Sequence, residues 1–170
     1  MAIQFPRILK NMNLFVDGRG YAGRVDEIEL PKLAMQSEEH RAGGMDAPVE
    51  IELGMEKLEA TVTLSDHDPE LFKLFGLVNH QSIPFTVRGS IQAQGSPAEP
   101  VVVQLRGGWK EIDPGTWKPG DKNVLKFAVG ANYYKLSIGG QDLIEIDVIN
   151  LVRVVGGKDQ LADIRGHLGL

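Results

Sequence analysis

Two glutamates, Glu50 and Glu52, are the first candidates for chemistry in this chain. In an extended strand, residues i and i+2 share one face and lie about 7 Å apart, a spacing that suits the carboxylate pair of a glycoside hydrolase. Such a pair also needs an apolar pocket that raises the pKa of one acid, and the surrounding residues predict none. The acidic pattern instead continues through Glu56 and Glu59. We therefore interpret it as a charged surface and predict no catalytic residue.

Other residue types offer less. The four histidines are scattered, and His67 lies between Asp66 and Asp68, where a cation site is one interpretation and a solvated helix cap is the better one. The chain contains no cysteine, which excludes a disulfide framework, a thiol nucleophile and a thiolate metal site. Phosphate-binding loops, nucleophile elbows and dinucleotide-binding glycine patterns are also missing from the sequence. We predict no cofactor and no metal.

The charge of the chain is concentrated in one segment. Residues 26–59 contain ten carboxylates and three basic side chains, a net charge of −7, whereas the whole chain carries −5. Within this segment, residues 49–53 alternate apolar and acidic side chains, which predicts a strand with one carboxylate-lined face. That face must meet water, and it makes sense if many copies together line a wet surface. The acidic balance argues against tight binding to a nucleic-acid backbone.

Length and composition indicate one soluble domain. The chain has 170 residues, enough for a full core. It contains no apolar run near the ~20 residues that a membrane-spanning helix needs. The first residues lack the basic and then apolar order of a secretory signal, so we expect synthesis and assembly in the cytoplasm.

The hydrophobic periodicity predicts a mainly β fold. We expect two packed antiparallel sheets, as a sandwich or barrel, with one mid-chain helix and a short C-terminal helix. Residues 21–39 and 49–64 should form a long hairpin with the flexible segment Arg41–Pro48 at its tip. The expected strands lie at residues 13–16, 21–30, 33–39, 49–53, 58–64, 85–93, 101–112, 124–138 and 143–149.

Helical spacing occurs in two places. Asp68, Pro69 and Glu70 are typical of a helix N-terminus, and the apolar positions that follow predict a helix that ends near Asn79. Near the C-terminus, the Gly156-Gly157 break precedes apolar residues at 161, 164 and 168. They predict a small amphipathic helix with Asp159 as its cap.

Seven segments in this order carry a resemblance to a known family. They are Asn13-Leu-Phe-Val-Asp-Gly18, Leu30-Pro-Lys-Leu33, Arg41-Ala-Gly-Gly-Met-Asp-Ala-Pro-Val49, Leu105-Arg-Gly-Gly-Trp-Lys-Glu-Ile-Asp-Pro-Gly115, Tyr133-Tyr-Lys-Leu136, Ile144-Glu-Ile-Asp147 and Asp159-Gln-Leu-Ala-Asp-Ile-Arg-Gly-His-Leu-Gly-Leu170. The chain resembles the major tail tube proteins of contractile-tailed bacteriophages, a group that includes the tube proteins of R-type bacteriocins. Each segment alone is weak evidence, but their order across essentially the whole chain is specific.

The resemblance implies a structural, non-enzymatic protein. Residues 1–170 would form a single tail tube domain, with an inter-ring loop at about 37–50 and extended termini. Hexameric rings would stack into a hollow tube that conducts DNA into the host during ejection. The implied partners are other copies of the chain, the tail sheath protein, baseplate and tail terminator proteins, a tape measure protein inside the tube, and DNA that passes without specific binding. The implied location is the virion tail, assembled in the cytoplasm of the host bacterium.

The resemblance also suggests where assembly residues lie. The predicted inter-ring contact comprises Arg41, Ala42, Gly43, Gly44, Met45, Asp46, Ala47 and Pro48. The candidates for the lining of the channel are Glu50, Glu52, Glu56 and Glu59, because a negative wall repels a phosphate backbone. A shift of one residue in register would exchange the two faces of a strand, so which glutamates point inward stays open.

Three alternatives remain. The tube of a headless R-type bacteriocin would pass ions instead of DNA, and a type VI secretion ring protein shares the same architecture. From a different class, a carbohydrate-binding or hydrolytic sandwich domain would use Glu50 and Glu52 as ligand-binding or catalytic groups.

Overall fold

The computed structural model describes residues 4–78 and 82–170 of the chain. All strand pairings within these residues are antiparallel, which confirms the predicted mainly β fold. The elements are β1 Ile8–Val16, β2 Arg19–Gly20, β3 Val25–Glu29, β4 Met35–His40, β5 Val49–Met55, β6 Leu58–Leu64, α1 Pro69–Phe72, β7 Ile83–Gln92, β8 Glu99–Asp113, β9 Leu125–Ile138, β10 Gln141–Asp147, β11 Val152–Val155, β12 Lys158–Asp159 and α2 Ala162–His167.

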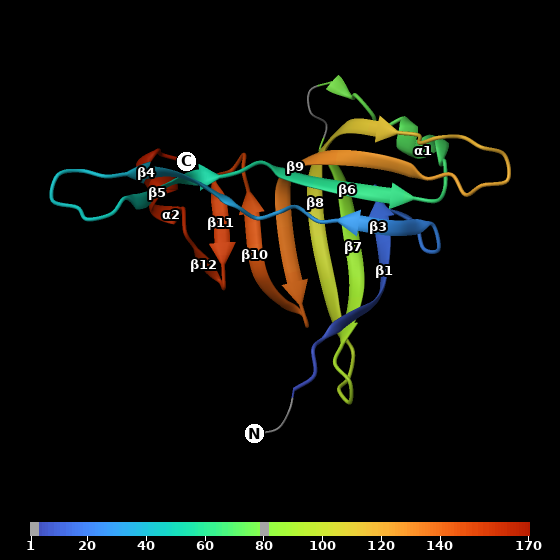
Figure 1. Ribbon diagram of the computed structural model, residues 1–170, viewed down its shortest axis with the longest axis horizontal. Coiled ribbons are helices and arrows are strands. Elements are labelled where there is room, and N and C mark those ends of the chain that lie inside the picture. Colours follow the sequence, from blue (N-terminus) through green and yellow to red (C-terminus); the bar gives the residue numbers. More distant parts are fainter. Residues whose placement is uncertain (1–3, 79–81) are drawn as a thin grey trace.

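Most strands belong to one sheet that folds over itself. Its main path runs β12-β11-β10-β9-β8-β7-β1-β2 and has two ends. The long strand β9 divides the sheet, because the same edge pairs with β6 over its first half and with β10 over its second half. Strands β6 and β3 therefore form a second layer, which crosses the strands of the first layer at a large angle (Figure 1). This is the orthogonal way of packing two antiparallel layers, and it confirms the predicted sandwich.

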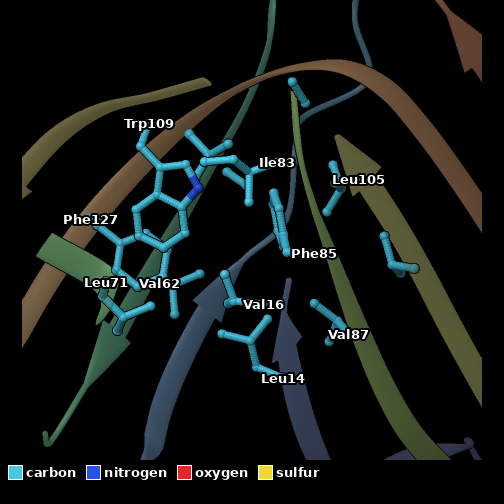
Figure 2. Close-up of a cluster of buried hydrophobic side chains, with 14 of the residues drawn as sticks. Leu14, Val16, Val62, Leu71, Ile83, Phe85, Val87, Leu105, Trp109 and Phe127 are labelled. Carbon is cyan, nitrogen blue, oxygen red and sulfur yellow. The ribbon is translucent and has the colours of Figure 1, made fainter. Parts of the chain in front are cut away.

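The core fills the space between these two layers. Leu14 of β1 and Phe85 of β7 point from the first layer toward Val62 of β6 in the second (Figure 2). All three are almost completely buried, and Trp109 stacks on Phe127 with ring centroids 3.9 Å apart at the corner of the sandwich. Alternate residues along each strand supply this core, as the strand period of two requires.

The predicted long hairpin is present. Strand β3 pairs with β6, and β4 pairs with β5 as a separate two-stranded sheet. The two arms of the hairpin, β3–β4 and β5–β6, therefore run antiparallel beside each other through most of residues 25–64. The segment between β4 and β5 is the Arg41–Pro48 tip that the sequence predicts.

The mid-chain helix begins as predicted but is much shorter. Asp68 is the N-cap, and its carboxylate accepts a hydrogen bond from Glu70 N at 2.9 Å. The helix ends at Phe72 instead of near Asn79, a position outside the described residues. Two features end it early: Gly76 adopts φ +68°, and Phe75 forms a bridge to Trp109 of β8. The apolar spacing after Phe72 therefore serves packing against the sheet, not a continuing helix.

The C-terminal region also differs from its prediction. The short strands β11 and β12 lie beyond the last strand expected from the sequence, and a turn at Gly156-Gly157 joins them. Helix α2 is present, but its N-cap is Leu161, which makes no side-chain cap. Asp159, the predicted cap, lies in β12, where its carboxylate accepts a hydrogen bond from Leu161 N at 3.0 Å and pairs with Arg165 at 2.8 Å. Asp159 therefore anchors the helix from outside it.

Tyr21 connects α1 to the core and makes the fold sensitive to alkaline pH. Its ring is buried, and its hydroxyl donates a hydrogen bond to Asp68 at 3.0 Å. Burial, followed by the nearby carboxylate of Asp68, raises the pKa of Tyr21 from 10.0 to about 12. Because the folded state favours the neutral phenol, this contribution to stability is complete below pH 10 and disappears as the pH rises to about 12.

We therefore expect Tyr21 to account for a loss of about 2–3 kcal/mol in the free energy of unfolding across this pH window. Urea unfolding at several pH values would measure it. Tyr21→Phe cannot ionise, so the variant should show a smaller decline than the wild type over the same window. Parallel declines in the two proteins would contradict the prediction.

Candidate assembly surfaces

The β4–β5 hairpin projects from the body of the molecule as a two-stranded ribbon (Figure 1). Every residue of β4 and the first five residues of β5 are exposed. At the tip, Met45 N donates a hydrogen bond to Ala42 O at 3.2 Å, and Gly44 adopts φ +86°. A lone two-stranded ribbon is marginally stable in water. We therefore expect the ribbon to pack against another protein surface.

The two faces of the ribbon differ in chemistry. On one face Glu39 lies directly opposite Glu50, an arrangement of like charges that destabilises a strand pair. On the other face Val49, Ile51 and Leu53 are exposed by 47%, 46% and 57%. A row of exposed apolar side chains on a projecting element marks an interaction surface.

The four glutamates predicted to line a channel do not all lie on one strand. Glu50 and Glu52 lie on β5, Glu56 follows it, and Glu59 lies on β6. Glu52 accepts a hydrogen bond from Arg153 at 2.8 Å, which ties the base of the hairpin to β11. That these glutamates line a channel stays a prediction.

Glu59 is the most constrained of the four. Leu58 and Ala60, its neighbours along β6, are core residues, so alternation turns Glu59 to the outer side of the β3–β6 layer. Its carboxylate is paired with Lys110 and with Lys57, the latter at 3.0 Å. Hydrogen bonds from Lys110 and Lys57 lower the pKa of Glu59.

The first layer has a polar face on the side opposite the core. Cross-strand pairing aligns its side chains, and Arg88, Gln104 and Arg106 among them are exposed. We call this surface the polar sheet face; apart from Ile8, Phe15, Pro84, Pro100 and Val102, its members are polar. It comprises Asn11 and Asn13 of β1, Thr86, Arg88 and Ser90 of β7, Gln104 and Arg106 of β8, Tyr133, Lys135 and Ser137 of β9, and Asp142, Glu145 and Asp147 of β10.

An open apolar groove lies beside the hairpin base. It has a volume of about 1270 Å³. Leu53 of the hairpin, Ile146 of β10 and Ile164 of α2 contribute apolar walls from three elements. Ile164 is exposed by 51%, so α2 covers this side of β10 and β11 only partly. The groove is an incomplete second core that another chain segment could complete.

Catalytic chemistry receives no support from these surfaces. Glu50 and Glu52 are exposed, so neither occupies the apolar pocket that an acid catalyst needs. Asp66 pairs with Arg24 at 2.9 Å, and Asp68 caps α1, so these carboxylates serve the fold. In residues 4–78 and 82–170, no group of three or more His, Cys, Asp or Glu side chains could hold a metal ion. The same residues contain no helix long and apolar enough to cross a membrane.

Comparison with known proteins identifies the family to which this chain belongs. The family model described as "Phage tail tube protein FII" matches residues 6–169, nearly the whole chain. The chain belongs to the phage tail tube protein family. The resemblance seen in the sequence is thereby confirmed, and the role of this tail tube family member is that of a structural subunit of a phage tail.

Individual relatives agree with the family assignment. The chain is 35% identical to the tail tube protein of Escherichia phage P2, over 97% of this chain and 98% of that protein. It is 33% identical to the major tail tube protein of Serratia phage KSP20, with 97% of each chain covered. Among solved structures, the sheath/tube terminator of an extracellular contractile injection system matches with a TM-score of 0.63 and 12% identity, over 80% of this chain and 99% of that chain. This last likeness concerns the fold alone.

The polar sheet face of this tail tube family member escaped prediction from the sequence. The sequence does contain a signal for it, because polar Gln104 and Arg106 alternate with the buried residues Val103 and Leu105. The signal identifies a strand with two different faces. It does not reveal that the polar sides of five strands join into one surface, since that depends on pairing between distant segments.

Proposed function

We propose that this tail tube subunit forms hexameric rings that stack into a hollow tube, through which DNA passes into the host. One observation carries the proposal. The main sheet has two free ends, and its second layer, hairpin and core all lie on one side, so the polar sheet face is left open. A sheet of this form can join edge to edge with copies of itself and present the polar face to a channel.

The two ends of the sheet supply the edges for such joining. Strand β1 pairs with β2 only at Phe15 and Val16, which leaves the outer edge of residues 8–14 without a strand among the described residues. At the other end, β12 covers only Val154 and Val155 of β11. Unpaired edges favour pairing with another chain, and joining two different edges gives a head-to-tail interface that can close into a ring.

Stacking of rings would use the hairpin. We propose that the tip Arg41–Pro48, within the inter-ring loop at about 37–50, contacts the next ring, and that Val49 and Ile51 become buried there. The open groove beside the hairpin base offers further apolar surface to a neighbouring copy. For the channel wall, the polar sheet face is a stronger candidate than Glu59, because Glu59 turns to the outer side of the β3–β6 layer. It is also a stronger candidate than Glu52, because Arg153 already pairs with Glu52.

The tube would work with other tail proteins. A sheath would surround it, baseplate and terminator proteins would meet its ends, and a tape measure protein would occupy its channel before DNA passes. A sheath/tube terminator of a contractile injection system has a similar fold, which is consistent with a neighbour of this kind. Assembly would take place in the cytoplasm of the host bacterium, without catalysis and without a cofactor.

Electron microscopy tests the proposal directly. Purified protein at rising concentration, viewed by negative stain, should form rings or hollow tubes, and sedimentation velocity should record the matching large species. Particles that stay monomeric at high concentration would contradict the proposed function.

A further inference from the structure

Several charged side chains of the polar sheet face are paired with one another across strands. Lys135 of β9 pairs with Asp142 of β10 at 2.8 Å. Tyr133 of β9 donates a hydrogen bond to Glu145 of β10 at 2.9 Å. The hydrogen bond between Lys135 and Asp142 raises the pKa of the lysine and lowers that of the aspartate, so both groups stay charged near neutral pH.

A second cation of this face is held in the same region. The guanidinium of Arg106 lies over the ring of Tyr133, 3.9 Å from its centroid, and 4.0 Å from Asp147. Arg88 lies farther along the face, 5.9 Å from the ring of Phe15. The paired positions on five neighbouring strands thus present basic groups on β7, β8 and β9 and acidic groups on β10.

Along β7 to β10, this face is therefore balanced in charge. Its basic members, Arg88, Arg106 and Lys135, are matched in number by its acidic members, Asp142, Glu145 and Asp147. The remaining polar members are neutral amides and hydroxyls. The acidic excess of the chain lies elsewhere: residues 26–59 hold a net charge of −7 and belong to the hairpin and the second layer.

We infer that the channel wall neutralises itself: Asp142 and Glu145 mask Lys135, and through this masking the wall lets a polyanion pass without gripping it. The inference rests on the proposed function. It differs from the acidic wall predicted from the sequence. There, the wall would repel the phosphates of DNA; here, DNA passes because carboxylates of the wall already pair with its cations. A free lysine or arginine binds phosphate by releasing counterions, so each unmasked cation would add a salt-sensitive contact with DNA.

Removing the masking carboxylates tests the inference. Asp142→Asn with Glu145→Gln keeps side-chain size and lets residue 145 still accept the Tyr133 hydrogen bond, while each subunit loses two negative charges. Tubes of this variant, mixed with short fluorescent double-stranded DNA, should retain DNA that sediments with them and resists DNase. A subunit that engages one phosphate through Lys135 should lose about threefold to fourfold in DNA affinity between about 50 and 200 mM salt.

A matched control separates the channel from the outer surface. Glu27→Gln with Glu29→Gln makes the same charge change on exposed positions of β3, in the outer layer. Wild-type and control tubes should protect no DNA. Protection in the wild type, equal protection in the control, or none in tubes of the Asp142/Glu145 variant would overturn the inference.

Failure of assembly has a separate readout. Negative-stain microscopy of each preparation shows whether tubes exist before DNA is added. If wild-type protein forms none, the proposed function fails and the inference fails with it. If only the double variant fails to assemble, Asp142→Asn alone removes the exposed partner of Lys135, and its tubes must then protect DNA for the inference to stand.

Discussion

Deleting Gly43–Ala47 from the hairpin tip should leave a folded subunit that no longer forms tubes. The tip is almost wholly exposed, and its backbone hydrogen bond joins Ala42 to Met45 within the tip itself, so the core loses nothing. The remaining residues, Arg41, Ala42 and Pro48, would join β4 to β5 as a three-residue loop, a common hairpin length. We expect the free energy of unfolding to change by less than about 1 kcal/mol, as for surface changes in general.

Circular dichroism and sedimentation velocity would measure the two halves of this prediction. The far-ultraviolet spectrum should match that of the wild type, whereas the large sedimenting species should be absent. A deletion of equal length at Gln94–Ala98, in the exposed loop between β7 and β8, serves as the control and should still assemble. Long tubes formed by the tip deletion would refute the assigned contact.

The parts of this fold that depend on local pattern could be predicted from the sequence. Alternation over residues 58–64 identifies β6, and the Asp68-Pro69 pair identifies the start of α1. The Arg41–Pro48 tip follows from its small and flexible residues between two strands. In each case the deciding interaction lies within a few residues along the chain.

The parts that depend on distant pairing could not. Helix α1 ends after one turn because Phe75 forms a bridge to Trp109, a residue more than thirty positions farther along the chain. The masked lysine Lys135 needs both the β9–β10 register and its bulge, which bring Asp142 beside it. Neither helical spacing nor charge counts contain that information. The acidic segment was therefore visible in the sequence, whereas the balanced polar sheet face was not.

Gly107→Ala should unfold the subunit or destabilise it severely, because the sandwich corner leaves no room for a side chain there. Strands β8 and β9 shift register between Arg106 and Gly107, where they pass from one layer to the other. A Cβ atom on Gly107 would lie 2.0 Å from Gly130 O, and backbone cannot yield as a flexible side chain can. We expect a loss of about 3 kcal/mol or more, against a typical total stability of roughly 5–15 kcal/mol.

The facing strand provides the matched control for this glycine. Gly130→Ala places its Cβ in open space, with no atom within 4 Å, so its cost should stay below about 1 kcal/mol. Urea unfolding of both variants measures the difference in their free energies of unfolding. The two alanines lie on opposite sides of one backbone contact. Equal stabilities would mean that the corner can open without cost. A large difference would identify the close approach of β8 to β9 as the feature that lets one sheet supply both a closed core and an uncovered polar face.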